Sequence, residues 1–115
     1  MKRIFPFIFL LVMACKEKSV PVPEEVIQKD KMKTILIDIH VADAVAETKA
    51  QAGMNEKLLT EEYHQQIFKN HQVTQQLFVE SMKFYESNPK LLDEMYAGIQ
   101  DELSKREAKQ TSNDQ

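Results

Sequence analysis

Apolar residues recur at every third or fourth position along most of the chain, and this spacing predicts α-helices. The first helix is expected to begin near Pro23, because proline suits a first helical turn and Glu24 and Glu25 would then lie at the positive end of the helix dipole. It should end by Gly53. Its apolar positions are Met32, Ile35, Leu36, Ile37, Ile39, Val41, Ala42, Val45 and Ala46. This face is wide, so we expect the helix to be covered on more than one side.

Two shorter helices are predicted next. A loop over residues 54–59 leads to Thr60, which is expected to cap a helix that ends near Asn70. In "VTQQLF", Thr74 caps the following helix, and the apolar residues on either side of it can form a hydrophobic staple. The residues that these two helices should turn inward are Tyr63, Ile67, Phe68, Leu77, Phe78, Ser81, Met82 and Tyr85.

The last helix is predicted from the "SNP" sequence, with Asn88 as cap and Pro89 at the first helical position. Within it, Gly98 either allows another helix to approach closely or is simply tolerated. The inward positions are Leu92, Met95, Tyr96, Ile99 and Leu103. The tail, residues 105–115, is polar and aperiodic, so we expect it to be disordered. The fold class is therefore all-α, a small bundle of three to four helices over residues 24–104.

Composition supports this fold and excludes some functions. A chain of 115 residues holds one domain at most, and its 2 glycines and 4 prolines are too few for a turn-rich β-fold. The net charge is −3, and Lys and Arg form no basic stripe, so we expect no nucleic-acid partner. One cysteine gives neither a disulfide framework nor a cysteine-based zinc site. No cofactor and no small-molecule substrate is indicated.

The first residues have the layout of a secretory signal. Lys2 and Arg3 precede an apolar run from Ile4 to Met13, which is shorter than the ~20 residues of a membrane-spanning helix. A small N-terminal core helix and an ordinary secretion signal are the alternatives. The sequence "VMAC" resembles a bacterial lipobox, in which cleavage occurs before a lipid-modified cysteine. We therefore predict a signal peptide over residues 1–14 and lipidation of Cys15.

Lipidation would have a large physical effect. Two or three acyl chains on Cys15 would hold the protein in a membrane essentially permanently, whereas one chain binds only reversibly. The thiol would be consumed, so it could not act as a nucleophile. Loss of two cations with the signal would change the net charge from −3 to −5. Residues 15–23, which include two prolines, are predicted to be a stiff tether between the lipid and the helical domain.

Candidate chemistry is sparse. At 100° per residue, His40, Asp43 and Glu47 fall on one edge of the first apolar face and could form one side of a metal site. A single helix supplies too few ligands, so we expect a structural role, with Asp43 pairing with His40 or capping a nearby backbone group. No metal ligand and no catalytic residue is assigned.

The other polar residues on or near apolar faces have plain structural explanations. His64 and His71 are seven residues apart and could share a face, but they are expected to be solvated or capping. Ser81 should bond to the carbonyl four residues before it. The methionines of the helical region could line an adaptable peptide groove, although core filling is the commoner role.

Two segments, "MKTILIDIHVADA" and residues 63–103, resemble the Domain of Unknown Function 4296 family of small Bacteroidota envelope lipoproteins. The family pattern of aspartate, aliphatic, histidine and a later acidic residue falls on Asp38, Ile39, His40 and Asp43, where the family more often has glutamate at the last position. Matches in the second segment are Tyr63, Phe68, Val73, Thr74, Phe78, Ser81, Tyr85, Asn88, Pro89 and Tyr96. The resemblance implies a fold, but no reaction, cofactor or catalytic residue.

These observations favour a non-enzymatic protein on a lipid anchor, in the outer membrane and facing the periplasm. We expect it to bind another protein, as an accessory subunit of an envelope complex. Residues 73–103 also resemble the helical part of periplasmic chaperones of the peptidyl-prolyl isomerase type, so a chaperone-like module for exported polypeptides is the alternative. An enzyme that uses His40, Asp43 and Glu47 is the third and least favoured hypothesis.

Overall fold

The computed structural model describes residues 21–114 and contains four α-helices, with no strand in that range. They are α1 (Lys29–Gln51), α2 (Glu56–Asn70), α3 (Gln75–Glu86) and α4 (Pro89–Asn113). The predicted all-α fold is confirmed. Cys15 and the predicted signal peptide lie outside the described residues. None of the helices within residues 21–114 is both long and apolar enough to cross a membrane.

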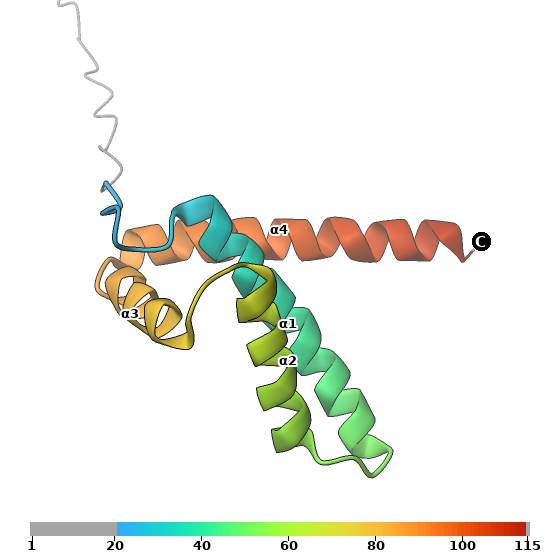
Figure 1. The fold of residues 1–115 in the computed structure, drawn as a ribbon. Coiled ribbons are helices and arrows are strands. Elements are labelled where there is room, and N and C mark those ends of the chain that lie inside the picture. The colour runs from blue at the N-terminus through green and yellow to red at the C-terminus, as the bar shows by residue number, and fades with distance from the viewer. Residues whose placement is uncertain (1–20, 115) are drawn as a thin grey trace, which may run out of the picture.

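The helices form an open arrangement (Figure 1). α1 and α2 make an antiparallel hairpin, α4 crosses the N-terminal half of α1, and α3 packs against α4. The hairpin and the C-terminal half of α4 diverge from the crossing point, so both project away from the rest of the bundle (Figure 1). This divergence leaves one side of α1 without a neighbouring helix, in contrast to our expectation that its wide apolar face would be covered.

The core lies where α1, α3 and α4 meet the C-terminal end of α2. Met32, Ile35 and Tyr85 are fully buried at its centre. Burial of one such side chain contributes about 1.5–3 kcal/mol to stability. The other buried apolar residues are Ile27, Ile37, Ala46, Ile67, Phe68, Leu91, Met95 and Ile99. Of the positions predicted to face inward on α4, Tyr96 is instead 45% exposed, and Leu92 packs against the core but is less buried than its neighbour Leu91.

The segment before α1 is not helical, which corrects the predicted helix start near Pro23. A turn closed by a hydrogen bond from the Val26 N–H to the Pro23 carbonyl leads to Ile27, and α1 begins at Lys29. The Ile27 N–H donates to Ser81 Oγ at 3.0 Å, and the Tyr85 hydroxyl donates to the Ile27 carbonyl at 2.6 Å. Both backbone groups of one buried residue are therefore satisfied by α3 side chains.

The start of α2 also differs from the prediction. Its N-cap is Asn55, whose side chain accepts a hydrogen bond from the Leu58 N–H, so most of the predicted loop at residues 54–59 is helical. Asparagine caps a helix at least as well as Thr60, and the earlier cap is the one used. The end of α1 agrees with the sequence, since Gly53 has a φ of 95°, a conformation that suits glycine.

The starts of α3 and α4 are confirmed. Thr74 Oγ1 accepts from the Leu77 N–H at 3.0 Å, and Pro89 is the first residue of α4. Asn88 precedes α4 as predicted, but its side chain donates to the Phe84 carbonyl instead of capping α4.

α4 continues to Asn113, in contrast to the disordered tail predicted from residue 105. Ion pairs one turn apart join Lys105 to Asp101 at 3.1 Å and Arg106 to Glu102 at 3.4 Å. Such pairs support a helix that has no apolar periodicity. Within α4, Gly98 lies against the side chain of Lys33, 3.4 Å from where a Cβ would be, so it is approached by a flexible side chain and not by a helix backbone.

Candidate functional site

The predicted cluster of His40, Asp43 and Glu47 does not assemble into one site. Asp43 pairs across the hairpin with His64 of α2, and not with His40. His40 is exposed and lies with Asp43 at a hollow on the α4 side of α1. Glu47 is exposed. No group of three or more His, Cys, Asp or Glu side chains within residues 21–114 is arranged to hold a metal ion.

Two Asp–His pairs connect α1 to α2. Nε2 of His64 lies 2.7 Å from Oδ1 of Asp43, and Nε2 of His71 lies 2.7 Å from Oδ2 of Asp38. The second pair is the more buried, with 19% of the His71 side chain exposed against 30% for His64. His64 of α2 and His71, the residue directly after that helix, thus both face α1, as their spacing allowed. His71 is the C-cap residue of α2, so the expectation of a capping histidine is confirmed there, and its ring also binds Asp38. His64 binds Asp43, which corrects the expectation for that residue.

A third polar contact lies nearer the tip of the hairpin. Nζ of Lys49 donates to the Tyr63 hydroxyl at 2.7 Å and lies 5.4 Å from the centre of its ring. Polar pairs therefore occur at three levels between the antiparallel helices. Side-chain hydrogen bonds of this kind fix which residues face one another, because a shift of either helix breaks all of them. We infer that the pairs set the alignment of the hairpin.

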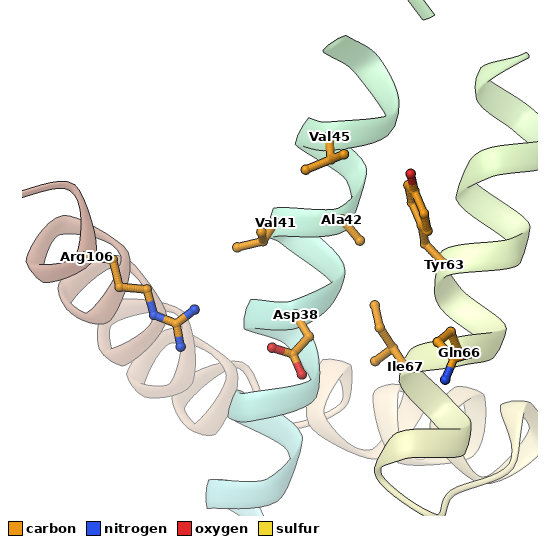
Figure 2. Close-up of a pocket in the computed structure, with 8 residues that line it drawn as sticks. All are labelled: Asp38, Val41, Ala42, Val45, Tyr63, Gln66, Ile67 and Arg106. Atoms are coloured by element: carbon orange, nitrogen blue, oxygen red, sulfur yellow. The ribbon is translucent and has the colours of Figure 1, made fainter. Parts of the chain in front are cut away.

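Beside this hairpin lies a largely apolar groove of about 340 Å³, which we call the three-helix groove. It is lined by Asp38, Val41, Ala42, Val45, Tyr63, Gln66, Ile67 and Arg106 (Figure 2). Figure 2 shows Ala42, Ile67 and Tyr63 between α1 and α2, and Val41 and Val45 on the side of α1 towards α4. Its surface is therefore formed by one stripe of α1 together with α2, and α4 contributes the Arg106 side chain at one edge.

Two features of the three-helix groove suit a protein partner. Val41 and Val45, one turn apart on α1, are each 41% exposed. Arg106 extends from α4 with its guanidinium directed towards α1 (Figure 2). A second hollow of about 790 Å³ shares Val41, Val45 and Arg106 and continues along α4 to Gln110. The apolar surface is thus continuous between the hairpin and the projecting end of α4.

The sequence contains a signal for this groove in the width of the apolar face of α1. Val41 and Val45 widen that face, and the pattern predicts that the helix is covered on more than one side. Among residues 21–114 no helix covers them, so an apolar stripe that was expected to be core is surface. The contribution of Arg106 could not be foreseen, because its position was expected to be disordered.

Comparison with known proteins gives one match. The family model described as domain of unknown function (DUF4296) matches residues 23–109, which is most of the chain. No curated protein and no solved structure matches the chain. The matched range includes every residue of the three-helix groove and both Asp–His pairs.

Proposed function

We propose that this chain, which belongs to the DUF4296 family, is a lipid-anchored cell-envelope protein that binds another protein through the three-helix groove. Its role would be non-enzymatic, as an accessory subunit of an envelope complex. The observation that carries the proposal is the uncovered stripe of Val41 and Val45, in a groove bounded by α2 on one side and by the Arg106 side chain of α4 on the other. Exposed apolar surface of this kind marks interaction sites.

The form of the groove favours a helical or extended peptide segment as the bound element. Such a segment could place an aliphatic side chain between Val41 and Val45, while Gln66 and the Arg106 N–H groups that Glu102 does not use meet its polar groups at the rim. Amphipathic segments bind grooves in this manner through a few apolar anchors. Arginine is also enriched at the energetic centres of interfaces.

The lipid anchor is supported by the sequence alone. A cation pair, a short apolar run and "VMAC" precede Cys15, and "VMAC" resembles a lipobox. Residues 15–23 would then connect the acyl chains to the segment that Ser81 and Tyr85 hold against the domain. We propose the outer membrane, on the periplasmic face, since "KEK" after Cys15 lacks the acidic run that accompanies export to the surface.

The alternative is a chaperone-like module that holds segments of many exported polypeptides. An open groove with a mixed polar rim would serve this role as well. The two roles differ in the number of partners. Crosslinking in the native cell followed by mass spectrometry distinguishes them, since a subunit gives one recurrent partner and a chaperone gives many unrelated exported proteins. The control is a Val41→Asp/Val45→Asp double variant. If the native chain yields no more crosslinked protein than this variant does, both the subunit role and the chaperone role are contradicted.

A further inference from the structure

We propose that a second surface, the groove between α2 and α3, binds a basic amphipathic segment of another protein. This α2–α3 groove has a volume of about 520 Å³ and is separate from the three-helix groove, with which it shares no lining residue. Its lining consists of Leu58, Glu61, Glu62, His64, Gln65, Phe68, Gln75, Phe78 and Val79. The proposal does not depend on the lipid anchor or on what binds the three-helix groove.

The base of the α2–α3 groove is apolar and fixed in place. The rings of Phe68 and Phe78 pack with their centres 5.0 Å apart and join the two helices. A hydrogen bond of 3.1 Å from Gln65 to Gln75 links the helices beside them. The groove is therefore formed before any partner binds, and this reduces the entropy lost on binding.

Its edges expose aliphatic side chains to water. Leu58 is 62% exposed at one end of the groove, and Val79 is 42% exposed on α3. Leu58, Gln65 and Phe68 lie at positions i, i+7 and i+10 of α2, so the groove follows one face of this helix for about three turns. A bound segment with aliphatic side chains at helical spacing could cover both exposed residues at once.

The charge of the α2–α3 groove determines the kind of segment. Glu61 and Glu62 line it, and no lysine or arginine does. Both glutamates are exposed, and neither side chain makes an ion pair or hydrogen bond within residues 21–114. His64 is the remaining ionisable group of the lining, and its Nε2 is already hydrogen-bonded to Asp43. A partner that brings lysine or arginine beside its aliphatic residues would therefore be attracted, and an acidic partner would be repelled.

A second copy of this chain is a poorer fit within its described part. The basic stretch of α4 has Lys105, Arg106 and Lys109, but the only apolar residue among them is Ala108. Lys105 and Arg106 are also paired within α4. That stretch offers charge without the aliphatic anchors that Leu58 and Val79 require, so we assign the groove to a different protein.

The test uses the full chain, with phosphatidylcholine nanodiscs present whether or not the chain inserts into them, and two synthetic peptides of about 14 residues, roughly four helical turns. One peptide is an amphipathic Leu/Lys helix, and the other is its Leu/Glu counterpart. Fluorescence anisotropy measures binding, and empty nanodiscs give the lipid background. We expect the Leu/Lys peptide to bind at least about tenfold more tightly than the Leu/Glu peptide, and its binding to weaken as salt rises from about 0.05 to 0.3 M.

Two charge-reversed variants locate the binding site. Glu61→Lys/Glu62→Lys should weaken binding of the Leu/Lys peptide at least about tenfold, because attraction at the rim becomes repulsion. The matched control Glu47→Lys/Asp93→Lys changes the net charge equally at exposed positions outside the groove and should leave the affinity within about twofold. Equal affinity for both peptides, or equal loss in the two variants, would overturn the proposal. So would concentration-dependent dimers that Glu61→Lys/Glu62→Lys abolishes, because the occupant would then be a second copy.

Discussion

Asp43 of α1 and His64 of α2 lie 2.7 Å apart across the hairpin, although they are 21 positions apart in the sequence. Asp38 and His71 repeat this relationship over a separation of 33 positions. Neither carboxylate is hydrogen-bonded to His40, although His40 is close to both aspartates in the sequence. Asp38 and Asp43 thus link α1 to the neighbouring helix of the hairpin, and the apolar stripe beside them remains exposed.

The Asp38–His71 pair should contribute more to stability than the Asp43–His64 pair. Its side chains are less exposed, 19% and 40% against 30% and 50%, so water screens the interaction less. We expect a coupling free energy of about 0.5–1.5 kcal/mol for Asp38–His71 and below about 0.5 kcal/mol for Asp43–His64. Double-mutant cycles to alanine, with urea unfolding as the measurement, check both values. Coupling that is larger for Asp43–His64 would contradict the inference.

Ser81→Ala should destabilise the protein by about 1–2 kcal/mol, because the buried N–H of Ile27 would lose its acceptor. Ser87→Ala is the matched control. Its hydroxyl makes a hydrogen bond to the Lys83 carbonyl on the exposed surface, so its removal should cost under about 0.5 kcal/mol. Urea unfolding gives both changes, and hydrogen exchange at the Ile27 amide should speed up only in Ser81→Ala. Unchanged exchange there would show that Ser81 does not hold the segment.

Tyr85 should make the protein less stable at high pH. Burial raises the pKa of its hydroxyl above the usual value near 10. Above pH 10 the unfolded chain therefore loses this proton more readily than the folded one, and the free energy of unfolding falls as pH rises. Tyr85→Phe should lower the free energy of unfolding by about 1–2 kcal/mol at neutral pH, since the Ile27 carbonyl loses its donor. The same variant should show a smaller fall of this free energy as pH rises above 10. Urea unfolding at pH 7 to 11 measures this, and parallel declines in both proteins would contradict it.

The two glycines of the chain should respond to alanine with opposite signs. A Cβ at Gly98 would meet only the Lys33 side chain at ordinary contact distance, so Gly98→Ala should stabilise α4 by about 0.5–1 kcal/mol. Gly53 has a φ of 95°, so Gly53→Ala should destabilise the protein by about 1 kcal/mol or more despite the open space around it. Thermal unfolding compares the two. A loss of stability in Gly98→Ala would show that Lys33 cannot move aside.

Local sequence predicted three helix limits well, although it missed the start of α2, where Asn55 caps in place of Thr60. Thr74, Pro89 and Gly53 act within one turn of their own positions, and the structure uses all three as expected. The start of α1 was misjudged because Ser81 and Tyr85, more than 50 residues away, hold Ile27 outside the helix. The continuation of α4 was missed because ion pairs, and not an apolar face, accompany its last turns.

The candidate site was harder to predict, because it depends on contacts between residues that are far apart in the sequence. A helical wheel groups His40, Asp43 and Glu47 correctly on one helix, but it cannot show that α2 brings a histidine to Asp43. Nor can it show whether Val41 and Val45 are covered, because that depends on the angle between α4 and the hairpin. Both questions concern contacts between helices, and the spacing of apolar residues within one helix does not predict such contacts.

The central claim, that the stripe of Val41 and Val45 binds a protein, is tested most directly by photocrosslinking in the native cell. A photoreactive residue placed at Val45 should form one recurrent adduct. At Glu47, two residues on and about 200° around the same helix, it should not. Val41→Asp should remove the Val45 adduct while the helical circular dichroism stays unchanged, since Val41 is 41% exposed. Equal adducts from Val45 and Glu47, or none from Val45, would contradict the account.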